Sequence, residues 1–452
     1  MRFLIIGGSD AGISAALRAR ELDHEVVITI VLADGYPNFS ICGLPFFPSG
    51  ETPDWHQLAH RTEFEGIELL LWHTAISIDP TAKIVEVVNR ENEHKRLQYD
   101  RLLIATGAVP SLAGIPDMDL PGVHRLHTME ESFAVQRQLL EENPHSVIIV
   151  GAGYIGVEMA DALVHRGLEV TLVGRPRSVL ETVDPELGEL IGKELSDHGV
   201  DVKTGVEVTG ICSSGCLRVV GSSGFEKSAD MVLVATGVRP SSELAVTAGI
   251  LTGSRSAIRV DPSMRTNVPD IYAAGDCVET WHRVLQEYRY LPLGTTSHKQ
   301  GRVAGENAVG GNKSFGGSVG TQVVKVFELA AGRTGLRDHE ARNAGFNPRT
   351  VETTAWDHKA YYPGAQQMKV RVTGDINSGK LLGAQIVGHW RSEVAKRIDV
   401  FAVGLFHGMS VEDLNELDLS YTPPLSSPWD AVQLAAQQWC RANSQALNTC
   451  PP

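Results

Sequence analysis

The chain has 452 residues, which predicts two or three domains at a usual domain size of roughly 100–200 residues. Hydrophobic residues make up 42% and charged residues 21%, a composition typical of globular proteins. The net charge of -14 argues against nucleic acid or an acidic membrane as partner, and no apolar run approaches the ~20 residues that cross a bilayer. Because six cysteines make no disulfide scaffold and the chain opens on a strand, we expect a cytoplasmic protein.

The first predicted element is a strand at Phe3–Ile6, followed by the loop Gly7-Gly8-Ser9-Asp10-Ala11-Gly12. A strand, a glycine loop and a helix in this order are typical of a dinucleotide site, in which Gly7 allows the tight turn and Gly12 the close packing of helix on strand. Ser9 stands where a middle glycine is usual. The second strand ends without an acid, so Asp34 either binds the adenosine ribose or only begins the next turn.

Two later strands run into the same kind of turn. Leu102–Ala105 ends in Thr106-Gly107, and Val232–Ala235 ends in Thr236-Gly237. Each turn would place small residues next to a nucleotide site, and the repetition indicates a duplicated architecture.

A second glycine loop, Gly151-Ala152-Gly153-Tyr154-Ile155-Gly156, follows the predicted strand Ser146–Val150. All three glycines of the dinucleotide fingerprint are present, so the pyrophosphate is expected at the start of the next helix. We expect Tyr154, Ile155 and Glu158, in the loop and that helix, to belong to the same site.

The coenzyme of this second site is indicated by the following strand, Glu169–Val173. An NAD site usually ends this strand with an acid, whereas here Gly174-Arg175-Pro176-Arg177 follows. Two guanidinium groups can pair with a 2′-phosphate, so the sequence favours NADPH, with NADH possible. The alternative is a solvated basic turn.

A third nucleotide-related segment reads Ile271-Tyr272-Ala273-Ala274-Gly275-Asp276. Together with Gly7, Gly12 and the Ala-Thr-Gly turns, it resembles the pattern of flavoproteins with two dinucleotide sites. That resemblance implies FAD in the first site, with Asp276 on its ribityl chain, and NADPH in the second.

We therefore predict an α/β fold with two Rossmann-like domains and a C-terminal α+β dimerisation domain. Strands near Gln322–Phe327 and Met368–Val372 and helices near Val394–Gly408 and Val411–Glu416 indicate that last domain. The expected boundaries are 1–112 for the first part of the FAD domain, 113–245 for the NAD(P)H domain, 246–320 for the second part of the FAD domain and 321–452 for the dimerisation domain.

Cys42 lies in the segment Asn38-Phe39-Ser40-Ile41-Cys42-Gly43-Leu44-Pro45-Phe46. With this segment, the chain resembles the pyridine nucleotide-disulfide oxidoreductases, and within them the single-cysteine branch of coenzyme A disulfide reductases, NAD(P)H oxidases and peroxidases. Members with two redox cysteines separate them by four residues, but Pro37 and Phe47 occupy those positions here. Cys42 thus has no local disulfide partner.

The resemblance implies that Cys42 exchanges electrons with the flavin. We expect a thiolate at a helix N-terminus, with a depressed pKa, that cycles through a mixed disulfide or a sulfenic acid. A buried structural cysteine is the alternative.

Three features bear on the substrate. Peroxidases and oxidases of this branch usually have a histidine where Asp10 stands, which weakens that assignment. Tyr361 and Tyr421 resemble tyrosines that coenzyme A disulfide reductases supply to the partner subunit's site, with Tyr362 a substitute and dimer packing the alternative. Arg18 and Arg20 could meet coenzyme A phosphates or form a solvated helix face.

The remaining cysteines have other expected roles. Cys440 and Cys450 lie in the segment Ala431–Pro452, which we expect to be a mobile tail with incidental thiols, although such a tail could pass electrons or metal to the partner's site. Cys212 and Cys216 have metal-like spacing but no further ligands, so no metal site is expected. Cys277 is expected to be structural.

The resulting hypothesis is a homodimeric FAD enzyme that uses NADPH to reduce a small-molecule disulfide or persulfide, with coenzyme A disulfide as the leading substrate. The alternatives are an NAD(P)H oxidase or peroxidase, a polysulfide or metalloid reductase and, outside enzymes, an electron-transfer partner or redox sensor.

Overall fold

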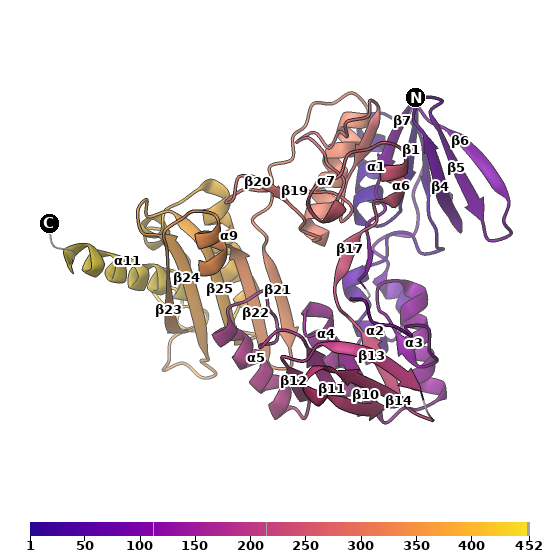
Figure 1. Cartoon of the computed structure of the whole chain (residues 1–452). Helices are drawn as coiled ribbons and strands as arrows, with labels where there is room; N and C mark the ends of the chain where they lie inside the picture. Colours follow the sequence, from indigo (N-terminus) through magenta and orange to yellow (C-terminus); the bar gives the residue numbers. More distant parts are fainter. Residues whose placement is uncertain (112, 214, 450–452) are drawn as a thin grey trace.

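The chain folds into two nucleotide-type α/β domains and a C-terminal α+β domain, which the computed structural model describes for all residues except 112, 214 and 450–452 (Figure 1). The first domain, indigo in Figure 1, is completed by pink segments that return from much later in the chain. The fold class predicted from the sequence is confirmed. Among the described residues, no helix has the length and apolar character needed to cross a bilayer.

The first domain is built on a parallel sheet with strand order β18-β7-β1-β2-β3. β18 pairs in parallel with β7, so a segment near residue 272 completes the sheet begun at the N-terminus. A three-stranded antiparallel sheet packs on the same core through Val85 and Val87. The elements are β1 (Arg2–Ile6), α1 (Asp10–Leu22), β2 (Val27–Val31), α2 (Phe46–Ser49), β3 (Ile67–Leu70), β4 (His73–Asp79), β5 (Ile84–Asn89), β6 (His94–Gln98), β7 (Arg101–Ile104), α6 (Glu243–Thr247), β18 (Ile271–Ala273), β19 (Thr280–His282), β20 (Glu287–Arg289) and α7 (Gly294–Ala308).

The second domain repeats this plan with strand order β12-β11-β10-β16-β9. Its first helix begins with a capping box. The Thr128 hydroxyl oxygen accepts a hydrogen bond from the backbone N–H of Glu131, and the Glu131 carboxylate accepts one from the backbone N–H of Thr128. The elements are β9 (Val123–His124), α3 (Met129–Glu141), β10 (Ser146–Val150), α4 (Tyr154–His165), β11 (Glu169–Gly174), α5 (Pro185–Asp197), β12 (Asp201–Thr204), β13 (Val208–Ser213), β14 (Leu217–Gly221), β15 (Glu226–Ala229) and β16 (Met231–Val234).

The chain crosses between the two nucleotide domains on an antiparallel pair, β8 (Ala108–Pro110) and β17 (Val238–Pro240). Each strand directly follows one of the Ala-Thr-Gly turns. Thr106 donates its hydroxyl hydrogen to the carbonyl oxygen of Ser241 at 2.6 Å, and Thr236 does the same to Ser111. The threonines of the repeated turns therefore tie each crossing strand to the other.

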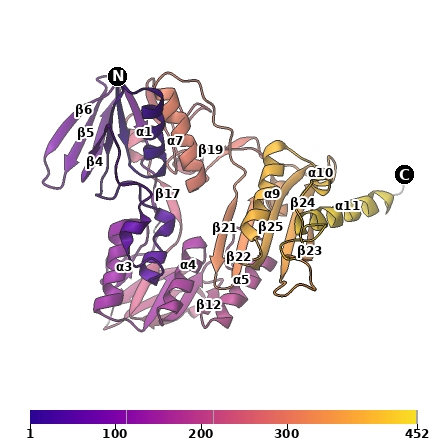
Figure 2. The same ribbon diagram turned by 180° about the vertical axis from the view of Figure 1, so that it is seen from behind.

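The C-terminal domain carries an antiparallel sheet with strand order β21-β22-β25-β24-β23 (Figure 2). Its strands and helices fall close to those predicted from the sequence. The elements are β21 (Gln322–Val326), β22 (Leu329–Gly335), α8 (Asp338–Asn343), β23 (Pro348–Trp356), β24 (Gln367–Asp375), β25 (Leu381–His389), α9 (Val394–His407), α10 (Val411–Asn415) and α11 (Ala431–Thr449).

The predicted mobile tail is wrong over its described part, because residues 431–449 form the helix α11. Apolar side chains at helical spacing, such as Val432 and Trp439, bury one face of α11 against β23 and β24. The Trp439 indole is 2% exposed, and its Nε1 donates to the carbonyl oxygen of Arg349 at 2.8 Å. Cys440 is half-buried on this packed helix, and Cys450 lies outside the described residues.

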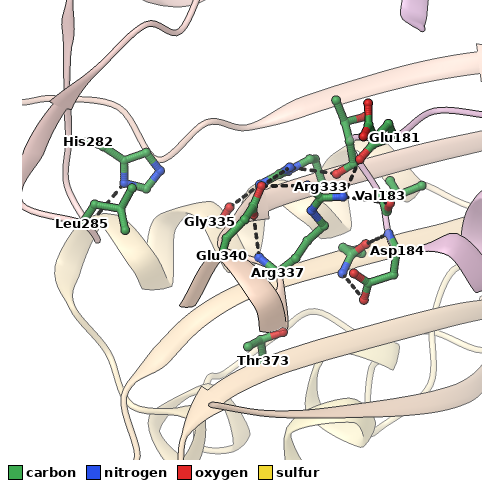
Figure 3. Close-up of polar contacts among 12 residues, drawn as sticks. Glu181, Val183, Asp184, His282, Leu285, Arg333, Gly335, Arg337, Glu340 and Thr373 are labelled. Carbon is green, nitrogen blue, oxygen red and sulfur yellow. Dashed lines mark hydrogen bonds and ion pairs between the residues drawn. The ribbon is translucent and has the colours of Figure 1, made fainter. Parts of the chain in front are cut away.

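Two partly buried arginines, Arg333 and Arg337, join the second and third domains (Figure 3). Arg333 donates to the carbonyl oxygen of Thr182 at 2.8 Å, and Arg337 donates to those of Glu181 and Val183. Both arginines also pair with Glu340. Burial opposes ionisation of Glu340, but the two guanidinium charges outweigh it and lower its pKa to about 2. The C-terminal domain thus supplies donors to the backbone that precedes α5.

Candidate active site

The first glycine loop makes backbone contacts that only glycine allows. A Cβ on Gly7, whose φ is +107°, would lie 2.1 Å from the carbonyl oxygen of Ala105, and one on Gly12 would lie 1.9 Å from that of Gly7. The loop therefore packs directly on the Ala-Thr-Gly turn. Next to it Gly107 has a positive φ and no atom within 4 Å of a would-be Cβ, which leaves open space for a ligand.

The second loop repeats the arrangement almost atom for atom. A Cβ on Gly151 would lie 2.2 Å from the carbonyl oxygen of Ala235, and one on Gly156 would lie 1.8 Å from that of Gly151. Gly153 and Gly237 face open space, as a site for a pyrophosphate requires. Tyr154 begins α4, and the Thr182 hydroxyl donates to its phenol oxygen at 3.2 Å.

The residues around Asp276 fit a bound FAD. Gly275 has a positive φ, and a Cβ there would lie 2.9 Å from that of Ala11, so the backbone passes close to the start of α1. Burial raises the pKa of Asp276, whose Oδ1 accepts from the Ser297 hydroxyl at 2.8 Å. Nearby, the buried phenol oxygen of Tyr290 has no hydrogen-bond partner among the described residues. A buried carboxylate and an unpartnered phenol beside open glycine turns suit the hydroxyl groups of a dinucleotide.

Asp34 follows β2, and its Oδ1 accepts from the backbone of Tyr36 at 2.9 Å. It therefore begins a turn, as one of the two sequence interpretations held. Burial raises the pKa of Asp34, with a smaller contribution from the charge of Glu130. Its role toward a ribose stays a prediction.

The environment of Cys42 differs from the one predicted. Cys42 lies on a 3-10 turn, Ile41–Gly43, and the helix that follows, α2, has only four residues and begins four positions later. Although Cys42 is exposed, partial desolvation of its thiol raises the pKa, and the charges of Asp10, Glu158 and Asp276 raise it further. The expected depression of this pKa is not found, because Cys42 does not begin a long helix and the side-chain charges that act on its thiol belong to acids.

Glu158 comes from the second nucleotide domain, in the first part of α4. Burial raises the pKa of its carboxyl to about 7, and the charge of Asp161 adds to this. The sequence placed Glu158 at the nucleotide, and the structure also makes its charge act on Cys42. One carboxyl group thus connects the two sites.

The Glu158→Gln variant should show a pH-dependent gain in stability. Because the folded-state pKa lies above the ordinary value near 4.3, the buried carboxylate destabilises the fold progressively from about pH 4.5 to 7. We expect the free energy of unfolding of the variant to exceed that of the wild type by up to about 3 kcal/mol at pH 8, and the difference to fall to about 0.5 kcal/mol at pH 4.5. Denaturant unfolding of the FAD-loaded protein at both pH values measures it; a constant difference would contradict the prediction.

Tyr361 and Tyr421 lie together on the C-terminal domain. Both are exposed, and the pKa of Tyr421 is raised first by partial burial and then by the neighbouring phenol of Tyr361. No described hydrogen bond joins either one to Cys42. Tyr362, Leu425 and Trp429 are exposed as well, so this domain carries several uncovered apolar side chains.

The four arginines singled out in the sequence divide into two pairs. Arg175 and Arg177 are exposed after β11, and neither is in an ion pair with a described residue. Arg18 instead pairs with Glu306 at 2.6 Å, and Arg20 donates to two backbone carbonyl groups. Arg18 and Arg20 are therefore engaged within the chain.

Sequence reasoning missed a histidine at this site. His298, on α7, places its Nε2 3.4 Å from Oδ1 of Asp10 and its Nδ1 2.9 Å from the hydroxyl of Ser14. No motif marks His298, and the pairing of α1 with α7 brings together residues 288 positions apart. Only the helix packing could have revealed it.

Comparisons with known proteins agree with this architecture. The family model described as pyridine nucleotide-disulphide oxidoreductase matches residues 1–301, and that of the family's dimerisation domain matches residues 321–432. The chain belongs to the pyridine nucleotide-disulphide oxidoreductase family.

Individual relatives align over nearly the whole chain. An NAD(P)H sulfur oxidoreductase (CoA-dependent) of Pyrococcus furiosus is 33% identical, covering 96% of this chain and 98% of the relative. An NADH oxidase of Methanocaldococcus jannaschii is 32% identical, covering 97% of this chain and 98% of the relative. Among solved structures, an NAD-dependent persulfide reductase from A. fulgidus has a TM-score of 0.95 at 36% identity, covering 99% of this chain and 84% of that one. The protein is thus a flavin-dependent NAD(P)H oxidoreductase, and its dimerisation domain indicates a homodimer.

Proposed function

We propose that this protein uses NADPH to reduce the sulfur–sulfur bond of a small-molecule disulfide or persulfide through Cys42, with coenzyme A disulfide as the leading substrate. The observation that carries the proposal is a single exposed thiol without a second local cysteine, whose pKa is influenced by the charges of Glu158 in the second nucleotide domain and Asp276 in the first. A thiol in this position must form its disulfide with a substrate. The CoA-dependent sulfur chemistry named for a 33% identical relative supports the choice of substrate.

The residues proposed to hold the cofactors follow from the two loops. Gly7, Gly12, Asp34, Thr106, Gly107, Gly275 and Asp276 would hold FAD, and Gly151, Gly153, Tyr154, Ile155, Gly156, Glu158, Arg175, Arg177 and Gly237 would hold NADPH. When bound, FAD relays the two electrons of the nicotinamide to sulfur. The thiolate of Cys42 attacks one sulfur of the substrate, the substrate's sulfur–sulfur bond breaks, and the first thiol leaves. Tyr361 and Tyr421 of the partner subunit would hydrogen-bond the departing sulfur.

The test is anaerobic oxidation of NADPH by the purified FAD-loaded protein with coenzyme A disulfide, glutathione disulfide, polysulfide or peroxide. We expect the fastest turnover with coenzyme A disulfide. Slow turnover of all four, with rapid oxidation once oxygen is admitted, would assign the chain to the oxidases instead. Fast turnover of polysulfide alone would retain the proposed role of Cys42 and replace coenzyme A disulfide by polysulfide as the substrate.

The preference for NADPH depends on Arg175 and Arg177, which are exposed and free of ion pairs within the described residues. Replacing both with alanine removes two cations from a 2′-phosphate but takes nothing from the 2′-hydroxyl of NADH. We expect KM for NADPH to rise at least about tenfold and KM for NADH to change less than about twofold, since charge-assisted bonds contribute roughly 1.5–3 kcal/mol each. Steady-state kinetics with both coenzymes decide it. An equal rise of KM for NADPH and for NADH would contradict the proposed preference for NADPH.

A further inference from the structure

Three polar side chains form a line across the sheet of the C-terminal domain. Arg333 of β22 lies opposite Gln385 of β25, and Gln385 lies opposite Arg371 of β24. Residues directly opposite each other on neighbouring strands point to the same face of a sheet, so these three side chains make up one polar row. Each of them contacts the second domain, at the residues that lead into α5.

The polar row holds both main chain and side chain of the second domain, at the junction that Figure 3 shows. Nη1 of Arg333 donates to the carbonyl oxygen of Thr182 at 2.8 Å. Oε1 of Gln385 accepts from the backbone N–H of Asp184 at 2.6 Å, and its Nε2 donates to Oδ2 of the same residue at 2.8 Å. The backbone from Thr182 to Asp184 is therefore fixed from the C-terminal domain.

Arg333 is oriented by its own domain before it reaches Thr182. Its Nη2 donates to the carbonyl oxygen of Gly335 at 2.6 Å and to Oε2 of Glu340 at 3.0 Å. A planar guanidinium held along one edge presents its remaining N–H groups in a fixed direction, which a lysine ammonium cannot do. The position of the Thr182 carbonyl group is thus set by a rigid donor.

On its other side, the segment around Thr182 contacts the second glycine loop and the helix after it. The Thr182 hydroxyl donates to the phenol oxygen of Tyr154, the first residue of α4, at 3.2 Å. The backbone N–H of Leu180 donates to the carbonyl oxygen of Ala152, inside the loop, at 2.9 Å. Leu180 is buried and has a φ of +51°, a conformation that a leucine keeps only where its surroundings hold it. Direct contacts therefore connect Arg333 through Thr182 to Tyr154.

We propose that Arg333 is a positioning residue of the coenzyme site: it holds Thr182 where the threonine hydroxyl orients the phenol of Tyr154 at the start of α4. The inference rests on the proposed function only in taking the second glycine loop as the coenzyme site. The start of α4 is expected to meet the pyrophosphate, which NADPH and NADH share. Arg333 should therefore affect both coenzymes equally, unlike Arg175 and Arg177.

Binding of the oxidised coenzymes tests this without turnover. NADP⁺ and NAD⁺ are titrated separately into the FAD-loaded dimer, and the heat of binding gives each Kd. Arg333→Met replaces the guanidinium by an apolar chain. We expect it to raise Kd three- to tenfold for both coenzymes, because the hydroxyl that orients Tyr154 is no longer held in place. An unchanged Kd for both, or a rise for one coenzyme alone, would overturn the proposal.

Arg371→Met is the matched control at the other end of the polar row. The Arg371 side chain is 15% exposed, close to the 12% of Arg333. It pairs with the side chains of Asp184 and Glu186. We expect both variants to lower the midpoint of thermal unfolding, but Arg371→Met to leave both Kd values within twofold of the wild type. If the two variants weakened binding alike, the row would act through general packing of the junction, and the proposal would fail.

Substitutions of Thr182 test the path of the effect. Thr182→Val keeps the carbonyl group but removes the hydroxyl, and it should raise both Kd values as much as Arg333→Met does. Thr182→Ser keeps the hydroxyl and should stay within twofold of the wild type. Adding Arg333→Met to Thr182→Val should change Kd by less than a further twofold, because both substitutions act through one hydroxyl. Additive effects would contradict the proposal. Arg333→Lys, which keeps a cation beside Glu340 but not the planar fork, replaces Arg333→Met if that variant does not fold.

The outcomes separate this inference from the proposed function. Binding of NADP⁺ and NAD⁺ needs neither Cys42 nor a disulfide, so a wild-type protein that binds them but reduces no disulfide would end the proposed function and leave this test decisive. Wild-type disulfide reduction together with an unchanged Kd in Arg333→Met would do the reverse. A wild-type dimer that bound neither coenzyme would overturn both.

Discussion

The Cys42→Ser variant should lose NADPH-dependent disulfide reduction by at least about 1,000-fold, because a serine hydroxyl neither forms the mixed disulfide nor accepts electrons as sulfur does. Binding of FAD should be unchanged, since Cys42 lies on a short surface turn that contributes no buried apolar side chain. Slow oxidation of NADPH by oxygen should persist. The measurement is anaerobic turnover with coenzyme A disulfide, alongside the flavin absorbance of the purified protein.

Cys216→Ser is the matched control, because Cys216 is also exposed and lies on the β13–β14 hairpin of the second domain. It should retain wild-type turnover. Disulfide reduction that survived in Cys42→Ser would move the chemistry to another thiol, and Cys440 would then be the next residue to replace.

The Trp439→Ala variant should be the most destabilising change in the C-terminal domain. The indole is 2% exposed and lies 2.6 Å from the would-be Cβ of Gly374, so the sheet has left room for it. Replacing a buried tryptophan by alanine costs about 3–5 kcal/mol through lost burial and the cavity left behind. The bond to the carbonyl oxygen of Arg349 is lost as well. Denaturant unfolding of the dimer, followed by circular dichroism and by subunit exchange, measures the loss.

Gln438→Ala, at the exposed neighbouring position, should change stability by less than about 0.5 kcal/mol. If both variants unfolded alike, α11 would not be part of the folded domain. Removing the segment after Ala431 would delete Trp439 too, so lost turnover in such a truncation would report unfolding. Cys440→Ser keeps the helix and tests the thiol alone.

The features that local sequence determines could be predicted. The glycines of both loops and of the Ala-Thr-Gly turns are required by contacts within a few residues or with one neighbouring strand, as the 1.9 Å and 1.8 Å approaches at Gly12 and Gly156 illustrate. The strands and helices of the C-terminal domain also followed from periodicity, with α9 and α10 each ending one residue before the prediction.

The features that depend on long-range packing could not be predicted. His298 meets Asp10 only because Gly301 and Gly305 bring two distant helices into contact. The pKa of Cys42 depends on acids from three separate segments, so a motif around the cysteine could not give its direction. The tail was predicted to be mobile, but Val432, Ala435, Ala436 and Trp439 bury one face of its helix in the core of the C-terminal domain.

The contacts of Arg333 and Arg337 with the backbone of residues 181–183, shown in Figure 3, affect which segments of this protein could be exchanged with those of its relatives. The backbone carbonyl groups before α5 receive hydrogen bonds from Arg333 and Arg337, which lie 151 to 156 residues later, in another domain. A chimera that imported only the coenzyme domain of a relative would juxtapose a foreign loop with these guanidinium groups. An exchangeable module would therefore be discontinuous, because it would have to carry Arg333 and Arg337 together with the coenzyme domain.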